Sequence, residues 1–144
     1  MKKILSIGLV LAALLIATVA PAAAANGATA TITKAWVIGP GGKLLNIGSQ
    51  GTGEITVAPG DNLIIMGMAK KDGKDTLTFN LTDTSADQTL ITTLFQAKAK
   101  KQAQVIQYKF TPDADGTHIF RFNVTNESGT ELDWAQITIQ AVTL

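Results

Sequence analysis

The 144-residue chain contains no cysteine and only one histidine. The absence of cysteine excludes disulfide bonds, thiolate metal ligands, cysteine nucleophiles and a lipid-bearing cysteine, and a single histidine excludes a multi-histidine metal site. Charged residues make up only 16% of the chain, against about 25% in an ordinary soluble protein. The net charge of +1 gives no electrostatic basis for binding nucleic acid. The length fits one domain, which excludes a multidomain enzyme.

The first 25 residues have the three-part layout of a secretory signal peptide. Two lysines follow Met1, residues 4–20 form an almost unbroken apolar run, and Pro21 precedes four alanines. This layout predicts a signal-peptide helix over residues 1–25, with cleavage after Ala25. A retained membrane anchor is the alternative, but the apolar run lies at the lower edge of spanning length and the alanine-rich exit favours cleavage. The mature chain, residues 26–144, is then expected to have no membrane span.

The mature chain is predicted to form short strands. Residues 76–82, 118–124 and 134–142 alternate between apolar and polar side chains, which is typical of a half-buried strand. Residues 63–68 are continuously apolar, as expected of a strand at the centre of a sheet or covered on both sides. The expected inward rows are Leu77, Phe79 and Leu81; Phe120, Phe122 and Val124; Ala135, Ile137, Ile139 and Ala141; Ile106, Tyr108 and Phe110; and Ile32, Trp36 and Ile38, interrupted by Lys34.

Turn-forming residues lie between these segments. Residues 39–42, 58–61 and 71–74 combine glycine with proline or aspartate, which favours tight turns. Turns at this spacing, with abundant Thr, Val and Ile, predict an all-β fold, a single antiparallel β-sandwich of Ig-like or jelly-roll type. Segment 96–107, rich in Ala, Lys and Gln, fits either a short helix or a long hairpin with a lysine-rich tip. The closely flanking strands favour the hairpin.

The order of turns and aromatic strands resembles a known family. Val-Ala-Pro-Gly-Asp at 57–61 leads into an apolar strand and then into Leu-Thr-Phe-Asn-Leu-Thr-Asp at 77–83. Tyr-Lys-Phe-Thr-Pro at 108–112 is followed by a glycine turn and Phe-Arg-Phe-Asn at 120–123. Over about residues 55–142 this order is similar to the Golgi-dynamics (GOLD) type of β-sandwich and its prokaryotic secreted relatives. The resemblance implies an interaction module and not a catalyst.

Two polar features suggest chemistry, and each has a simpler explanation. The chain contains no Gly-x-Ser-x-Gly nucleophile elbow, so His118 has no serine nucleophile of that kind to activate. Because His118 lies in one row with Phe120, we expect it to be a core or edge residue at a strand end. Asp113 and Asp115 precede Gly116, but an EF-type calcium loop needs a later glycine and a distant glutamate. A turn in which aspartate accepts backbone N–H groups is the favoured interpretation, with calcium binding as the alternative.

Large aromatic side chains are the candidate contact residues. Trp36, Trp134 and Tyr108 could form a platform for a sugar or a protein partner. Trp134 is the strongest candidate because it lies on the opposite side of its strand from Ala135. The alternative is that Trp134 caps the core beneath a loop, since large aromatic residues are usually buried.

The remaining motifs are weaker. Lys98, Lys100 and Lys101 form a small basic tip with too few charges for a nucleic-acid site, which indicates a solvated loop. Glycosylation sequons begin at Asn80, Asn123 and Asn126.

The sequence predicts a secreted or cell-surface protein that acts by binding and is not an enzyme. No cofactor is expected, and the expected partner is an extracellular protein or a glycan. The alternative is a structural subunit of an extracellular filament or surface layer, which self-associates by β-strand addition at an open sheet edge. Residues 26–33, uncharged and rich in small side chains, are the predicted donor strand.

The signal-peptide interpretation is testable by mass spectrometry. We expect the exported protein to begin near Asn26, shortened by about the first 25 residues, because the small residues before that point fit a signal peptidase. Recovery of a chain with intact Met1 from the membrane fraction would establish a retained anchor instead.

Overall fold

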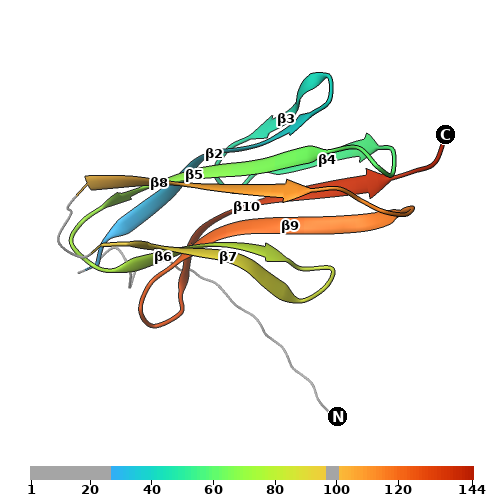
Figure 1. Cartoon of the computed structure of the whole chain (residues 1–144). Helices are drawn as coiled ribbons and strands as arrows, with labels where there is room; N and C mark the ends of the chain where they lie inside the picture. Colours follow the sequence, from blue (N-terminus) through green and yellow to red (C-terminus); the bar gives the residue numbers. More distant parts are fainter. Residues whose placement is uncertain (1–26, 97–100) are drawn as a thin grey trace, which may run out of the picture.

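The computed structural model describes residues 27–96 and 101–144, which form β-strands and no helix (Figure 1). The signal-peptide prediction for residues 1–25 lies outside these ranges. Within them, no helical segment is long and apolar enough to cross a membrane. The strands are β2 (Thr29–Gly39), β3 (Gly42–Ile47), β4 (Thr52–Val57), β5 (Leu63–Asp72), β6 (Leu77–Asp83), β7 (Gln88–Phe95), β8 (Lys101–Phe110), β9 (Gly116–Thr125) and β10 (Glu131–Ala141).

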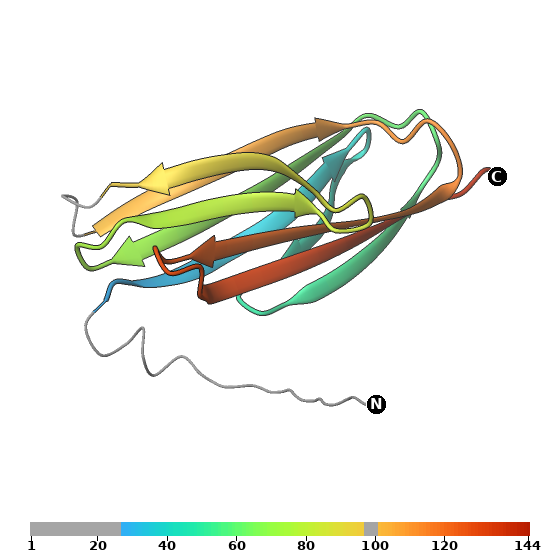
Figure 2. The same cartoon turned by 90° about the horizontal axis from the view of Figure 1, so that it is seen from below.

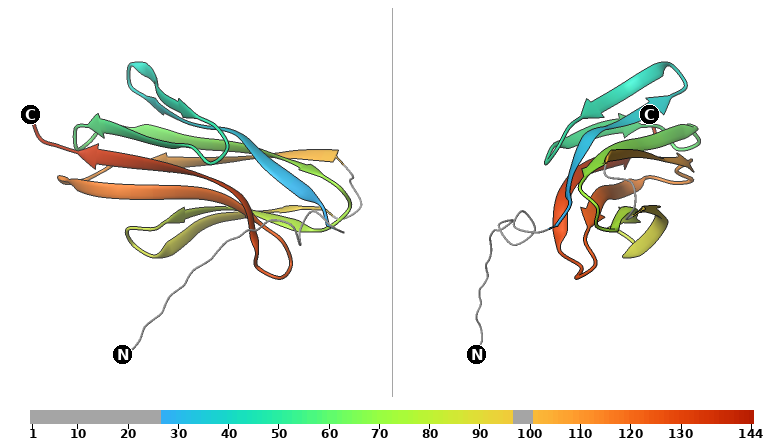
Figure 3. Two further views of the ribbon diagram at one scale, coloured as in Figure 1. Left: turned by 180° about the vertical axis from the view of Figure 1, so that it is seen from behind. Right: turned by 90° about the vertical axis from the view of Figure 1, so that its left-hand side faces the viewer.

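The strands build two facing sheets, which Figures 2 and 3 show from three further sides. The five-stranded sheet has the order β4-β10-β9-β6-β7, and the four-stranded sheet has the order β3-β2-β5-β8. All neighbouring strands are antiparallel except β4 and β10, which run parallel. The predicted all-β sandwich is therefore confirmed, with one parallel pair that the sequence did not indicate.

The core lies between the sheets and is built from the predicted alternating rows. Strands β6, β9 and β10 turn every second side chain inward, and Phe79, Phe120 and Phe122 are completely buried. The ring centroids of Phe79 and Phe122 lie 5.9 Å apart, and Phe120 packs edge-on against Phe110 at 5.0 Å. The inward rows of these three strands are confirmed, because burying one face of a strand requires an apolar residue at every second position.

A glycine in β5 allows the two sheets to approach each other. Gly67 faces Phe122 across the core, and a Cβ atom at position 67 would lie 2.5 Å from Cε1 of that ring. This distance is well inside van der Waals contact, so any larger residue would have to displace the ring or the strand. The glycine thus sets the spacing of the sheets at this point.

Strand β2 departs from the expected pattern. Its pairing with β5 shifts between Ile32 and Lys34, which is a β-bulge. Ile32 is buried before the bulge and Val37 is buried after it. Trp36 and Ile38 consequently point outward and are only half-buried. The predicted inward row of Ile32, Trp36 and Ile38 was therefore wrong, because Lys34 marks a change of phase along the strand.

Strand β5 is an inner strand of its sheet, paired with β2 and β8. Leu63 and Ile65 point inward and are buried, whereas Ile64, Met66 and Met68 point outward and are half-buried. The predicted central position is confirmed. No further layer of the described chain covers the outer side of the strand, so its continuous apolar run is enclosed on one side only.

Segment 96–107 forms neither a helix nor a hairpin in the described residues. Residues 101–107 belong to β8, which pairs with β5 along its whole length, from Leu63 beside Phe110 to Asp72 beside Lys101. The preceding strand β7 pairs with β6 in the other sheet. The favoured hairpin was therefore wrong, because the chain crosses between the sheets where a hairpin would stay in one. Residues 97–100, with Lys98 and Lys100, lie outside the described ranges.

The predicted donor strand is used within its own sandwich. Residues 29–32 pair with residues 69–72 of β5, with Thr29 beside Asp72 and Ile32 beside Ala69. The edge of β5 that a donated strand would fill in a neighbouring molecule is thus filled by β2 of the same chain. The prediction that residues 26–33 are donated is corrected on this ground for the described part, residues 27–33.

The close approach at Gly67 gives a stability prediction. Gly67→Ala should destabilise the fold by about 1–3 kcal/mol, because the added methyl group meets the Phe122 ring and a packed core relaxes only partly. Equilibrium unfolding in urea measures the change. Gly41→Ala is the matched control, since a Cβ atom there meets nothing within 4 Å. Equal unfolding midpoints for the two variants would contradict the proposed role of Gly67.

Candidate functional site

The aromatic residues predicted to share one contact surface lie in three separate places. Trp134 points outward from β10 on the five-stranded sheet. Trp36 points outward from β2, on the other side of the sandwich. Tyr108 points into the sandwich from β8 and packs against Phe120, with ring centroids 6.3 Å apart. A single platform of the three residues was therefore a wrong prediction, and the molecule has two outer faces to consider.

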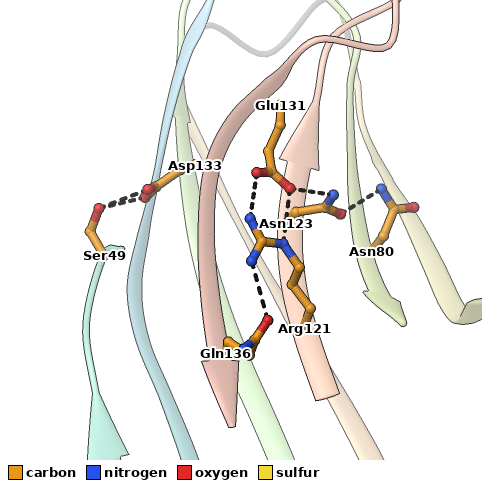
Figure 4. A network of polar contacts seen from close by, with 7 residues as sticks. All are labelled: Ser49, Asn80, Arg121, Asn123, Glu131, Asp133 and Gln136. Carbon is orange, nitrogen blue, oxygen red and sulfur yellow. Dashed lines mark hydrogen bonds and ion pairs between the residues drawn. The ribbon is translucent and has the colours of Figure 1, made fainter. Parts of the chain in front are cut away.

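The outer face of the five-stranded sheet carries a ladder of polar side chains (Figure 4). Strand pairing places Trp134, Asn123, Asn80 and Thr92 side by side on β10, β9, β6 and β7. The hydroxyl of Thr92 donates to Oδ1 of Asn80 at 3.1 Å. Nδ2 of Asn80 donates to Oδ1 of Asn123 at 3.1 Å, and Nδ2 of Asn123 donates to Oε2 of Glu131 at 2.9 Å. The ladder thus runs across four strands and ends at a carboxylate.

Glu131 gives the ladder its direction. An ionised carboxylate only accepts hydrogen bonds, so Asn123 turns its amide nitrogen toward Glu131 and its oxygen toward Asn80. Arg121 donates to both carboxylate oxygens, at 3.2 Å from Nε and 2.7 Å from Nη2, which is a two-point ion pair. Its Nη1 also donates to Oε1 of Gln136 at 3.3 Å. The hydrogen-bonding groups of these polar side chains are therefore paired with one another.

Arg121 also covers the indole of Trp134. The guanidinium carbon lies 4.4 Å from the centre of the ring, within range of a cation–π interaction. The predicted outward position of Trp134 is confirmed, since it lies on the opposite side of β10 from the buried Ala135. One side of the indole is nevertheless occupied by the protein itself.

The outer face of the four-stranded sheet is apolar along its centre. Strand pairing places Trp36 beside Met66, and Ile38 beside Ile64. Val105 on β8 extends this surface and is 50% exposed. We call this surface the Trp36 face, and it consists of Trp36, Ile38, Ile64, Met66, Met68 and Val105.

Lysines surround the Trp36 face. Nζ of Lys34 lies 4.6 Å from the centre of the Trp36 ring, again within cation–π range. Lys43 on β3 and Lys109 on β8 are exposed on the two flanking strands. Near the C-terminal end of β5, Lys70 lines an open depression of about 620 Å³. The apolar centre is thus bordered by positive charge.

Charge is divided between the two sheets. The strands of the four-stranded sheet carry Lys34, Lys43, Lys70, Lys71, Lys101 and Lys109 against Asp72 alone. The strands of the five-stranded sheet carry Glu54, Asp83, Glu131 and Asp133 against Arg121 alone. Lys71 and Asp133 are buried, but the remaining side chains still leave an excess of lysine on the four-stranded sheet and an excess of carboxylates on the five-stranded sheet. The small net charge of the whole chain conceals this division.

A buried carboxylate holds the bulge that turns Trp36 outward. Asp133 is 3% exposed, and its Oδ2 accepts the backbone N–H of Ile32 at 2.6 Å. Both carboxylate oxygens lie 2.8 Å from the hydroxyl of Ser49, in the connection between β3 and β4 (Figure 4). The N–H at the bulge therefore finds its acceptor on the opposite sheet, where an unpaired buried donor would be costly.

The other polar candidates have structural roles in the described residues. His118 is half-buried and packs edge-on against Phe110, with ring centroids 4.8 Å apart, which confirms the expected position at a strand end. Asp113 and Asp115 are both exposed, and Oδ1 of Asp115 accepts the backbone N–H of Thr143 at 2.9 Å. Within residues 27–96 and 101–144, no group of three or more His, Cys, Asp or Glu side chains could hold a metal ion.

The Trp36 face was not predicted from the sequence, although two signals of it were present. The run of apolar residues at 63–68, predicted to be a strand at the centre of a sheet or covered on both sides, contains an outward row of Ile64, Met66 and Met68. Lys34 within the apolar segment was the sign of the bulge. A change of phase at Lys34 would have placed Trp36 on the same side as Met66.

Neither a family model nor a curated protein matches the chain. Among solved structures it is similar to the CARDB domain of a Pyrococcus furiosus protein, which was crystallised in complex with di-metal ions. The TM-score is 0.50 and the sequence identity 12%, over 80% of this chain and 89% of that one. At this identity the similarity shows the fold, a two-sheet β-sandwich, and nothing about ligands. The resemblance to the GOLD type is not supported and is corrected to this coarser assignment.

The bond from Asp133 to the bulge gives a second stability prediction. Asp133→Ala should destabilise the fold by about 1.5–3 kcal/mol, because the buried N–H of Ile32 loses a charged acceptor. Asp113→Ala is the control and should change stability by less than about 0.5 kcal/mol, since that side chain is exposed. Urea unfolding of both variants makes the comparison. A loss no larger than that of the control would show that the carboxylate does not hold the bulge.

Proposed function

We propose that this protein is a secreted or cell-surface binding module, not an enzyme, and that it holds its partner on the Trp36 face. The observation that carries the proposal is the apolar centre of the four-stranded sheet, which no other element of the described residues covers. Contiguous apolar patches with a polar rim are typical of protein contact sites. Trp and Met are among the residues enriched there. The leader layout of residues 1–25 supports export of the chain.

The chemistry of the rim specifies the partner as a protein surface with an apolar centre and flanking carboxylates. Lys34, Lys43, Lys70 and Lys109 border the face, and Asp72 is the only acidic residue on the same four strands. Complementary charge speeds association and suppresses wrong partners. Because rim charges are exposed to solvent, their contribution should weaken as salt rises.

The Trp134 side of the molecule is a poorer binding surface. Its ladder from Thr92 to Glu131 is already hydrogen-bonded, and Arg121 lies over the indole. A sugar that stacked on that side of Trp134 would first have to displace a guanidinium held by Glu131. A glycan partner at Trp134 is therefore disfavoured relative to a protein partner on the Trp36 face.

A second function, that of a structural subunit of a filament or surface layer, is favoured by the division of charge. The lysine-bordered Trp36 face of one copy complements the more acidic side of the next. A contact between two different faces builds an open assembly when the rotation from one copy to the next does not close a ring. Face-to-face stacking replaces strand donation in this alternative, because residues 29–33 belong to their own sheet.

Site-specific photo-crosslinking tests both functions. Gln107 is exposed on β8 beside Met66, so a photoreactive residue at position 107 should form an adduct with a protein of the envelope of the exporting cell. Met66→Glu, which puts a charge into the apolar centre, should lower the adduct yield at least about tenfold, equivalent to about 1.4 kcal/mol of binding free energy.

The matched control lies on the other side of the sandwich. Thr138, like Met66, is half-buried and points outward from its strand. Thr138→Glu should therefore leave the yield of the adduct at position 107 unchanged. Urea unfolding should show that both variants are folded. An adduct between two copies of the chain would support the structural subunit. A photoreactive residue at position 138 tests the opposite face. An adduct formed from position 138 and not from position 107, or a yield at position 107 that Met66→Glu does not lower, would contradict both functions.

A further inference from the structure

We propose that Asn126 is a site of N-linked glycan attachment on the folded protein, and that Asn80 and Asn123 are not. All three residues begin sequons, so the presence of the motif alone does not single out Asn126. The structure separates them by what each side-chain amide nitrogen does. The inference requires export of the chain but does not depend on the Trp36 face.

Asn126 lies in the turn between β9 and β10, which projects from the body of the sandwich (Figure 3). Its backbone N–H donates to the carbonyl of Thr130 at 3.0 Å, and the N–H of Gly129 donates to its carbonyl at 2.9 Å. Glu127 and Ser128, the other two residues of the sequon, are exposed. Asn126 itself is half-buried, but it lies in a projecting turn whose other sequon residues are exposed, where an enzyme can reach it.

The side chain of Asn126 is oriented with its oxygen held and its nitrogen open. Oδ1 accepts the N–H of Ser128 at 3.1 Å, the hydroxyl of Ser128 at 2.8 Å and the N–H of Thr130 at 2.9 Å. Because the amide is planar, holding Oδ1 over the turn directs Nδ2 away from it. Nδ2 donates no hydrogen bond to the described residues, and it is the atom that an N-glycosylation enzyme must reach.

Asn80 and Asn123 use the same nitrogen inside the polar ladder. Nδ2 of Asn80 donates to Asn123, and Nδ2 of Asn123 donates to Glu131. Both residues lie in strands, β6 and β9, that have a hydrogen-bonded neighbour on each side. A transferase could take hold of either sequon only by opening the sheet, and central strands open only with much of the global unfolding free energy.

The attachment step is a simple displacement. Nδ2 of Asn126 forms a bond to C1 of the first sugar of an oligosaccharide carried on a lipid phosphate. The bond from C1 to the phosphate oxygen breaks, the lipid phosphate leaves with the bonding electrons, and one amide proton passes to a base of the transferase. Oδ1 remains a carbonyl oxygen and keeps the bonds from Ser128 and Thr130, so the turn tolerates the product.

The test uses the exported chain, purified after folding. The protein is incubated with membranes that contain an N-oligosaccharyltransferase and its lipid-linked oligosaccharide, and glycopeptides are mapped by mass spectrometry. We expect at least about tenfold more glycan on Asn126 than on Asn80 and Asn123 together, because their strands must open first. A peptide of residues 125–131, modified in the same membranes, shows that the transferase is active.

Variants that leave every asparagine in place complete the experiment. Ser128→Ala removes the third sequon and should abolish modification, whereas Ser128→Thr keeps a hydroxyl at that position and should retain it. Thr125→Val removes the sequon of Asn123 and should change nothing. Glycan on Asn80 or Asn123 of the folded chain, or an unmodified Asn126 while the peptide is modified, would overturn the proposal.

Discussion

The hydrogen bond from the backbone of Ile32 to the buried carboxylate of Asp133 determines how the first strand enters the sandwich. It joins the two sheets at the β2 bulge, and Ser49 brings the connection between β3 and β4 to the same carboxylate. A charge at 3% exposure is tolerated there because it accepts hydrogen bonds from both segments. Without the bulge, Trp36 would point into the core and the outer face of the four-stranded sheet would lose its central side chain.

The parts of the fold that could be predicted are those decided within one strand. The inward rows of β6, β9 and β10 follow from alternation alone, because each strand has one packed face. The bulge in β2, the parallel pairing of β4 with β10 and the crossing from β7 to β8 depend on partners far along the chain. The pattern of apolar and polar residues within one strand does not show which distant strand it pairs with, so these three features could not be predicted from it.

The same limit explains the outcome for the candidate surfaces. Trp134 was placed correctly because its strand alternates without interruption, whereas Trp36 was misplaced by the bulge. The ladder from Thr92 to Glu131 requires the register of four strands, and each of its residues taken singly looks like an ordinary solvent-facing side chain. Strand register, more than residue type, decides which polar groups in this protein are already engaged and which are open to a partner.

The long reach of the bond at the bulge affects the order in which the protein is completed. Ile32 and Asp133 are 101 residues apart, so the bulge of β2 has no acceptor for its N–H until β10, the last strand of the described residues, is available. Strand β10 also lies between β4 and β9, so β4 cannot be part of the five-stranded sheet without it. Non-local closure of this kind is slow. A growing chain therefore cannot complete the β2 bulge or the five-stranded sheet until its C-terminal strand is available, and folding is finished only after that strand has been synthesised.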